Sequence, residues 1–198
     1  KNEINSGLLR LMITRGEITG TPWNHGGKPG IYISIRPISS LPQSPVKVIY
    51  FDESNYPIIR FNPAIKSMNY IGNMKAKQDA ERKGAYEPVF YNGNGIITEC
   101  AIRNIFFIKN NEFITPSLDL GVLPGVMRNT IINIAKNMNI TVHESHIYYH
   151  QINTMDEAFI SSTGIGLLPC YWDKWESGHK ITQKIKSSLN ELIKLNKI

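Results

Sequence analysis

The stretch I-I-R-F-N-P-A-I-K-S-M-N-Y, residues 58–70, decides how the rest of this chain is interpreted. Two isoleucines and Phe61 are typical of a short β-strand, Pro63 follows, and residues 67–83 show the pattern of an amphipathic helix. Lys66 is therefore predicted to lie at a strand-to-helix junction, facing a cleft. A partly desolvated lysine there can lose its proton and attack a carbonyl carbon to form a Schiff base. Since most lysines are solvated surface charges, the remaining sequence has to support this role.

Composition narrows the class of protein. The 198 residues, of which 41% are hydrophobic and 10% aromatic, suit one globular domain or one large and one small. No apolar run approaches the ~18–20 residues of a membrane span, and no secretory leader is recognisable, so we expect no membrane association. The two cysteines, Cys100 and Cys170, make no disulfide or metal pattern, which favours the reducing cytoplasm.

The basic character of the chain suggests an anionic partner. The formal net charge is +6 and the pI is about 9.3. Nucleic-acid binding would need the 22 basic residues on one face with exposed aromatic side chains, but they are scattered and interleaved with acids. A non-catalytic basic binding protein is therefore a remote alternative, and we expect no nucleic acid as a partner.

The apolar patterns predict an α+β fold with a β-rich core and helices packed on its outside. The turn residues Asn92–Gly95 and Asn110–Asn111 each indicate a β-hairpin. Expected strands or hairpins cover residues 8–14, 31–37, 46–51, 88–98, 104–115 and 140–147. Residues 157–169 are expected to form one buried strand that ends in hydroxyls and glycines, and helices are expected at 67–83, from about 126, and from about 182.

Three further stretches carry candidate chemistry. Glu99 follows an apolar strand and is either a solvated strand-end carboxylate or a buried one that holds a cationic ring nitrogen. In L-P-G-V-M-R the backbone N–H groups of Val126 and Met127 lie at a predicted helix N-terminus, which can bind an anion. The stretch S-S-T-G, residues 161–164, can donate O–H and N–H groups to a phosphate or carboxylate.

No metal site is predicted. His143, His146 and His150 lie close together in the sequence, but their spacing is too irregular for a metal-ligand motif, and solvated or capping histidines explain them better.

Four blocks in order resemble the class IV aminotransferases, the fold-type IV pyridoxal phosphate (PLP) enzymes. The blocks are I-K-S-M-N-Y-I-G-N-M-K-A-K-Q-D-A with K-G-A-Y-E, I-T-E-C-A-I-R-N-I-F-F-I-K, I-T-P-S-L-D-L-G-V-L-P-G-V-M-R and D-E-A-F-I-S-S-T-G. The resemblance runs from about residue 7 to the C-terminus. It implies a small-molecule substrate, PLP as the cofactor, and a homodimer with its active site near the subunit interface.

The resemblance assigns roles to matching residues. It implies that Lys66 forms the Schiff base with PLP and later moves protons, and that Glu99 keeps the pyridine nitrogen protonated. Tyr70 matches the hydrogen-bond partner of the cofactor's phenolic oxygen. Val126 and Met127 match the backbone donors to the phosphate. Thr163 matches the hydroxyl that completes this cradle, and Thr163 and Gly164 are expected to contact substrate.

The chain also departs from the family pattern. We expect residues 1–198 to represent mainly the large C-terminal PLP-binding domain, because the family's N-terminal small domain, with its phosphate-binding arginine, is not recognisable and the chain starts at Lys1. Met127 stands where many members have threonine, which removes one hydroxyl contact. A degenerate member that binds PLP without turnover remains an alternative on these grounds.

Motif details favour one member of the family. The loop E-I-T-G-T-P-W-N-H-G-G lacks the Arg-x-His pair of D-amino-acid aminotransferases, and Ser67-Met68 and Cys100 replace glycines of branched-chain enzymes. T-E-C and G-x-M-R are similar to 4-amino-4-deoxychorismate lyases, which release pyruvate and leave 4-aminobenzoate for folate synthesis. We therefore expect this lyase reaction, with Lys66 taking the α-proton; the alternative is an aminotransferase of branched-chain or D-amino acids.

Overall fold

The chain forms two compact units, Lys1–Leu41 and Pro42–Ile198. The computed structural model describes residues 7–18, 20–21, 23, 27–38, 40–42 and 45–195. In the first unit, both strands are present as predicted, β1 (Gly7–Thr14) and β2 (Gly30–Pro37), and they pair as an antiparallel ribbon. Because side chains alternate between faces, one face of the ribbon is aliphatic throughout. Its members, all exposed, are Leu9, Leu11, Ile13, Ile31, Ile33 and Ile35.

The second unit is built on an eight-stranded mixed sheet with the order β5-β4-β3-β10-β9-β6-β7-β8. β3 pairs in parallel with β4 and β10, β7 pairs in parallel with β8, and the other neighbours are antiparallel. The strands are β3 (Val46–Asp52), β4 (Glu87–Tyr91), β5 (Ile97–Cys100), β6 (Asn104–Lys109), β7 (Glu112–Pro116), β8 (Val142–Ser145), β9 (Glu157–Ser162) and β10 (Gly166–Tyr171).

This sheet curls around a core. β5, an edge strand in the pairing order, also contacts β6 and β7, so the two parts of the sheet approach each other. Alternation along β6 divides its side chains between two clusters: Ile105 and Phe107 join the core inside the curl, and Phe106 and Ile108 pack against helices. Three 3-10 turns complete the unit, at Glu53–Asn55, Leu118–Leu120 and Tyr149–Thr154.

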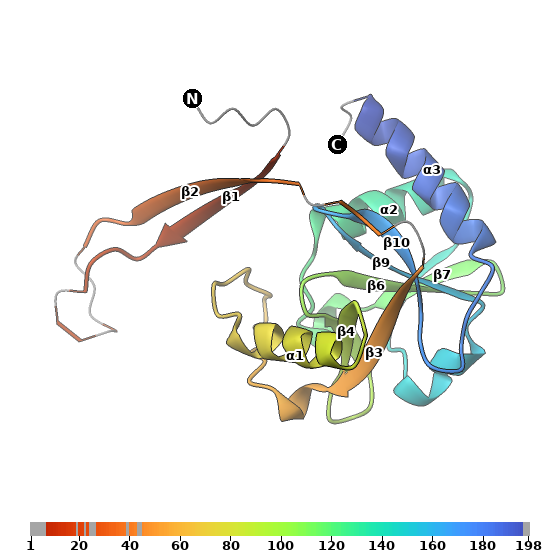
Figure 1. Ribbon diagram of the computed structural model, residues 1–198, viewed down its shortest axis with the longest axis horizontal. Coiled ribbons are helices and arrows are strands. Elements are labelled where there is room, and N and C mark those ends of the chain that lie inside the picture. The colour runs from red at the N-terminus through yellow and green to blue at the C-terminus, as the bar shows by residue number, and fades with distance from the viewer. Residues whose placement is uncertain are drawn as a thin grey trace. The chain divides into compact units, whose positions relative to one another are not determined.

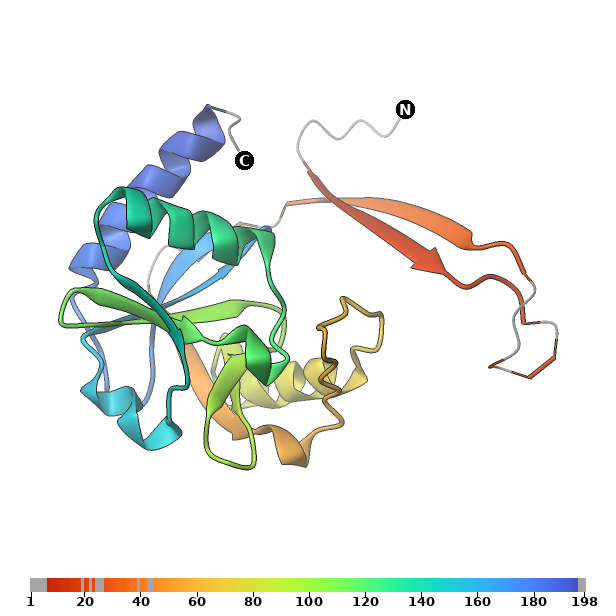
Figure 2. The same ribbon diagram turned by 180° about the vertical axis from the view of Figure 1, so that it is seen from behind.

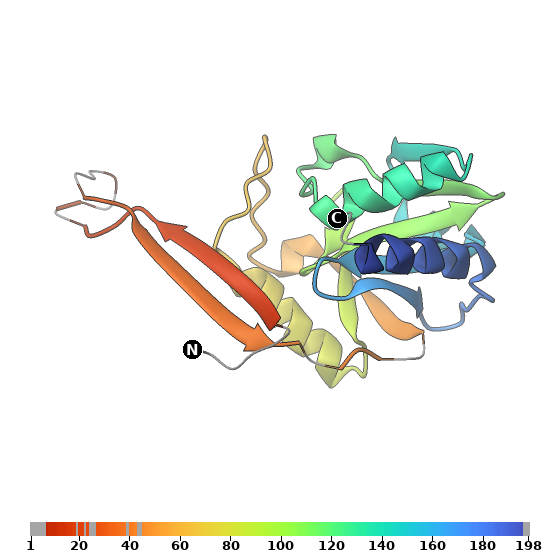
Figure 3. The same ribbon diagram turned by 90° about the horizontal axis from the view of Figure 1, so that it is seen from above.

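In the part of the second unit that the structure describes, three α-helices cover the outside of the sheet. α2 (Val126–Asn137) and α3 (Lys180–Lys194) pack on β9, and α3 also packs on β10; the two helices contact each other (Figures 1 and 3). α1 (Ile71–Arg82) packs on β3 and β4, away from α2 and α3 (Figures 1 and 2). The predicted α+β class, with a β-rich core and outer helices, is confirmed. None of the helices in the described part is long and apolar enough to cross a membrane.

Two predictions about elements are wrong. Residues 58–61 form no strand and continue as irregular chain up to α1, which starts at Ile71 rather than at residue 67. The proline and the loss of sheet partners after β3 leave this segment without ladder hydrogen bonds. The stretch 157–169 is two strands, β9 and β10, which pair antiparallel across a tight turn at Thr163–Ile165.

A close backbone contact positions α1. Gly72 is buried, and a Cβ atom added there would lie 2.5 Å from the Pro57 carbonyl oxygen. Only glycine therefore lets the first turn of α1 rest on the segment that leads to Lys66.

We expect Gly72→Ala to destabilise the protein by about 1–3 kcal/mol, because overpacking outweighs the ~1 kcal/mol of helix propensity that alanine adds. Urea unfolding of wild type and variant measures this difference. The matched control is Gly93→Ala, where an added Cβ meets nothing within 4 Å. A Gly72→Ala variant as stable as wild type would show that this contact relaxes freely.

Candidate active site

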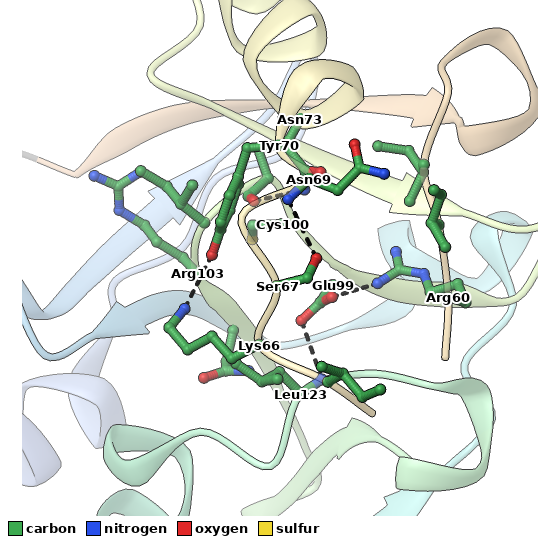
Figure 4. A pocket seen from close by; sticks show the side chains of 16 residues that line it. Arg60, Lys66, Ser67, Asn69, Tyr70, Asn73, Glu99, Cys100, Arg103 and Leu123 are labelled. Carbon is green, nitrogen blue, oxygen red and sulfur yellow. Dashed lines mark hydrogen bonds and ion pairs between the residues drawn. The ribbon is translucent and has the colours of Figure 1, made fainter. Parts of the chain in front are cut away.

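A cavity of about 110 Å³ opens in the second unit where the segment before α1 meets the end of β5 (Figure 4). Its apolar lining includes Ile58, Ile59, Ile65 and Leu123. Its polar and charged lining residues are Arg60, Lys66, Ser67, Asn69, Tyr70, Asn73, Glu99, Arg103 and Asn104.

Lys66 and Tyr70 reach the cavity from the irregular segment that precedes α1. The Lys66 ammonium donates a hydrogen bond to the Tyr70 hydroxyl at 3.0 Å, and Tyr70 is the N-cap residue of α1 (Figure 4). The helix thus orients the tyrosine that holds the amine. The expected desolvation of Lys66 is not provided by this unit, because the lysine is exposed there.

Glu99 lies on β5, and its side chain is 19% exposed. One carboxylate oxygen accepts a hydrogen bond from the Arg60 guanidinium, and the other accepts a long one, 3.4 Å, from the Leu123 backbone N–H (Figure 4). Burial raises the pKa of Glu99, while Arg60, the Leu123 N–H and Lys66 act in the opposite direction. Of the two interpretations of Glu99, the mostly buried carboxylate is the correct one.

The raised pKa of Glu99 predicts how stability depends on pH. The folded state binds the Glu99 proton more tightly than the unfolded state, so this residue stabilises the fold fully below its ordinary pKa of about 4.3. That contribution is lost as the pH rises through the folded-state pKa. We therefore expect the stability of wild type relative to Glu99→Gln, measured by urea unfolding, to fall from pH 4 upward. A rise over this interval would show that Arg60 outweighs burial.

The wall formed by residues 99–104 is held by side chains of α1 and β4. The side-chain amide of Asn73, on α1, donates to the Ala101 carbonyl at 2.7 Å. Glu87, fully buried on β4, accepts a hydrogen bond from the Ile102 backbone N–H at 3.1 Å and pairs with Arg103. The carboxylate of Glu99 is therefore presented near the end of β5, directly before a segment that is anchored by these contacts.

Asn104 connects the cavity to the N-terminus of α2. It lines the cavity, and a Cβ added to Gly125 would lie 2.6 Å from its side-chain oxygen. The N–H groups of Val126 and Met127 lie in the first turn of α2 and therefore have no acceptor within the helix. The N-cap residue, Gly125, makes no side-chain capping bond to them. Asn104 also lies opposite Ser161 in the β6–β9 ladder, and the buried Ser161 hydroxyl has no hydrogen-bond partner among the described residues. A helix N-terminus and an unpaired hydroxyl thus lie beside the cavity.

The structure brings some of the predicted residues together but not others. Lys66, Tyr70 and Glu99 line one cavity. Val126 and Met127 start α2 as predicted, and the Met127 side chain is buried in the helix-facing core. Thr163 and Gly164 are exposed in the β9–β10 turn and are not among the residues that line the cavity. Their roles, like those of the other predicted site residues, stay predictions.

Among the cavity-wall residues that the sequence analysis missed are Arg60, Asn104 and Leu123. The signal for Arg60 was present, since a charged residue interrupts the apolar run I-I-R-F. Asn104 and Leu123 lie within two of the blocks that carry the family resemblance, but nothing in their local sequence distinguishes them. Their role depends on which segments the sheet brings together.

Two of the histidines, His143 and His146, pair with carboxylates. His143 contacts Glu112 and His146 contacts Asp119, each at 2.9 Å, on the surface. Within the described ranges, no group of three or more His, Cys, Asp or Glu side chains could hold a metal ion. Part of the loop that lacks the Arg-x-His pair, including Asn24–Gly26, lies outside the described residues.

Comparison with known proteins agrees with the fold. The sequence model of the family described as amino-transferase class IV matches residues 1–171. A Methanocaldococcus jannaschii protein named "Putative branched-chain-amino-acid aminotransferase" is 31% identical over 172 residues, which cover 86% of this chain and 60% of that protein. The D-alanine aminotransferase of Listeria monocytogenes (strain F2365) is 31% identical over 179 residues, covering 85% and 59%.

Lyases are also among the similar proteins. The aminodeoxychorismate lyase of Bacillus subtilis is 32% identical over 105 residues, which cover 53% of this chain and 36% of that protein. The crystal structure of a Legionella pneumophila protein named "Putative 4-amino-4-deoxychorismate lyase" superposes with a TM-score of 0.83 at 25% identity, covering 93% of this chain and 69% of that one.

The predicted family is thus confirmed by sequence and by structure. The chain spans 60% and 59% of the lengths of the first two relatives, so it corresponds to part of each. The match of the family model over residues 1–171, together with the superposition, leaves one conclusion: this chain belongs to the class IV aminotransferase family.

Proposed function

We propose that this protein is a PLP-dependent enzyme in which Lys66 carries the cofactor and Glu99 pairs with its ring nitrogen. The observation that carries the proposal is the shared cavity: an amine hydrogen-bonded to a phenol, and a mostly buried carboxylate, line the same 110 Å³ space in a chain of this family. The amine suits the aldehyde of PLP, the phenol its phenolic oxygen, and the carboxylate its pyridinium nitrogen.

The residues around the cavity fit the remaining part of PLP, its phosphate. The N-terminus of α2 presents the N–H groups of Val126 and Met127, which have no acceptor within the helix, and the helix dipole favours an anion there. Gly125 leaves the space that a Cβ atom would fill beside Asn104. Ser161, opposite Asn104 in the ladder, lies near the end of the neighbouring strand β9, and its hydroxyl has no hydrogen-bond partner among the described residues. Thr163 follows directly after this strand. These features support a phosphate at the N-terminus of α2.

When bound, PLP supplies an aldehyde that reacts with amines and a cationic ring that withdraws electrons from the substrate α-carbon. Lys66 binds the cofactor, and its freed amine then takes the substrate α-proton. Tyr70, 3.0 Å from the Lys66 nitrogen, orients that amine. Glu99 keeps the ring nitrogen protonated by pairing with it.

For the reaction we propose cleavage of 4-amino-4-deoxychorismate to 4-aminobenzoate and pyruvate. Lys66 then takes the α-proton and protonates the methylene carbon of the departing three-carbon fragment. The motifs T-E-C and G-x-M-R and the two similar lyases support this reaction. The alternative is a PLP-dependent aminotransferase of branched-chain or D-amino acids, which the longer matches to aminotransferases support.

We further propose that residues 1–198 act with a small domain of the kind that the family carries at its N-terminus, and as a homodimer. Three aliphatic side chains that line the cavity are more than half exposed in the second unit: Ile59, Ile65 and Ile102. Apolar side chains at the mouth of an active site support a covering surface there.

The experiment that tests the cofactor proposal is the visible spectrum of the purified chain mixed with PLP, before and after borohydride, followed by peptide mapping. A new band that borohydride removes, with the reduced adduct on Lys66, is the expected result. Lys75→Ala, which removes an exposed lysine from α1, is the matched control and should leave the adduct unchanged. An adduct spread over several lysines would contradict the proposal.

Substrates then separate the two reactions. A lyase releases pyruvate and 4-aminobenzoate from aminodeoxychorismate without an added 2-oxo acid. An aminotransferase instead converts D-alanine or L-leucine only when 2-oxoglutarate or another 2-oxo acid is present. A chain that forms the Lys66 adduct but turns over none of these substrates would favour a PLP-binding member without turnover.

A further inference from the structure

Arg60 is held firmly beside Glu99 by bonds that use most of its donors. Its side chain is only 18% exposed. One terminal nitrogen donates to Glu99, and the other donates to Glu53 and to the Thr98 hydroxyl, both at 2.9 Å. The Arg60 Nε donates to the same Glu53 oxygen at 3.3 Å. A planar guanidinium fixed at three points has one orientation, and that orientation fixes the Glu99 oxygen that it contacts.

Arg60 forms ion pairs with two carboxylates, those of Glu53 and Glu99. Glu53 and Glu99 carry formal charges of −1 each, and Arg60 carries +1, so the group of three has one negative charge left over. The Thr98 hydroxyl, which contacts Arg60 and Glu53, is neutral. Lys66, which lines the same cavity, is the remaining charged group that acts on Glu99. Glu99 can therefore be kept ionised by Arg60 and still attract a second cation from the cavity.

The second oxygen of Glu99 is bound more loosely than the first. Its one backbone donor, the Leu123 N–H, lies 3.4 Å away, at the long end for a hydrogen bond. Figure 4 shows Arg60 on one side of the carboxylate and Leu123 on another, with Lys66 across the cavity. A stronger donor entering the cavity can thus pair with Glu99 without displacing Arg60.

We propose that Arg60 is a positioning residue for Glu99: it keeps the carboxylate ionised and oriented toward the cavity, and Glu53 limits how much of the Arg60 charge Glu99 receives. The proposal rests on the proposed function, because the cation that Glu99 would hold is the protonated ring nitrogen of PLP. Without Arg60 the Glu99 carboxylate becomes more basic, and the proton of the N–H···O pair moves from the ring nitrogen to Glu99. When Glu53 is neutral, Arg60 forms an ion pair with Glu99 alone. The Glu99 carboxylate then becomes less basic, and the proton stays on the ring nitrogen.

The first arm of the test needs no cofactor. The titration of Glu99 in the 198-residue chain is followed by NMR with 13C-labelled glutamate carboxyl groups, and its signal is assigned by its loss in Glu99→Gln. We expect the titration to move to higher pH in Arg60→Met and less far in Arg60→Lys. In Glu53→Gln we expect it to move to lower pH. Arg82→Met, which removes an exposed arginine paired with Asp79, is the control and should change nothing.

These shifts distinguish positioning from a merely structural role. A structural role for Arg60 would lower the unfolding temperature of the variants without opposite displacements of one titration. If Arg60→Met fails to fold, the opposite shifts of the Glu99 titration expected in Arg60→Lys and Glu53→Gln still test the proposal. A Glu99 titration that stays in place in every Arg60 variant, or that moves to higher pH in Glu53→Gln, would overturn the proposal.

The second arm separates this proposal from the proposed function. The probe is 4′-deoxypyridoxine 5′-phosphate, which has the ring nitrogen and phosphate of PLP but no aldehyde and so cannot bond to Lys66. We expect Arg60→Met to weaken its binding at least about tenfold, and Arg60→Lys to restore part of the loss. If wild type does not bind the probe although the titrations shift as expected, the proposed function fails and the Arg60–Glu99 coupling stands. If wild type and Arg60→Met bind equally well, the role of Arg60 toward the ring is refuted.

Discussion

Lys66→Ala is expected to lower turnover of the substrate by about four orders of magnitude, because one side chain serves both as the attachment point of the cofactor and as the proton carrier. The variant should also show no absorption band that borohydride removes. Steady-state kinetics of the chain with aminodeoxychorismate, and with amino acid and 2-oxo acid pairs, measure the first effect, and the spectrum measures the second.

The fold should tolerate this change. Lys66 is exposed in the second unit and donates one hydrogen bond, to Tyr70, so its removal should alter the free energy of unfolding by only about 0.5 kcal/mol. Added methylamine should restore part of the activity of Lys66→Ala by replacing the missing amine. Full activity in Lys66→Ala, or an equal loss in the control Lys75→Ala, would show that the catalytic amine has been assigned to the wrong residue.

Glu87→Gln is expected to destabilise the fold by about 3–5 kcal/mol, since it leaves the Arg103 guanidinium without its carboxylate. Glu87 is fully buried and Arg103 is 9% exposed, so water cannot replace the lost partner. Burial raises the pKa of Glu87, while Arg103, the Ile102 N–H and Lys77 counteract that effect. Urea unfolding at neutral pH measures the difference in stability.

An exposed ion pair on α1 provides the control. Glu81 pairs with Lys77 in an i,i+4 arrangement, and its side chain is 59% exposed, so Glu81→Gln should cost at most about 0.5 kcal/mol. Replacing Glu87 and Arg103 together by methionine should recover most of the loss, because no buried charge is then unpaired. A Glu87→Gln variant as stable as Glu81→Gln would show that Arg103 finds water or another acceptor.

Much of the fold could be predicted from the sequence because it depends on local patterns. Alternation in β6 and β7 around Asn110–Asn111 indicates a hairpin, and both asparagines have the positive φ values that such turns require. The irregular segment 58–70 was misassigned for a physical reason. Its isoleucines have high β propensity, but a strand forms only where a partner strand supplies hydrogen bonds, and propensity does not show whether one is present.

The candidate site was likewise predictable only in part. The resemblance of the blocks around Lys66, Tyr70 and Glu99 to the class IV aminotransferases implied a PLP enzyme, and an amine and a carboxylate suit that cofactor's chemistry. The exposure of Lys66 in its unit and the location of Thr163 and Gly164 outside the cavity wall were not foreseen. Exposure depends on what packs over a residue, and no residue's own type determines its neighbours.

The sequence by itself determined the family, most strands and helices, and which side chains have the chemistry of the proposed reaction. These features depend on periodicity and on motifs within short stretches of chain. Only the tertiary structure decided that Arg60 contacts Glu99, 39 residues away, and that Gly125 lies against Asn104 beside the cavity. The reason is that strand order and register bring distant segments together, and the electrostatics of Glu99 depend on those contacts rather than on the sequence around it.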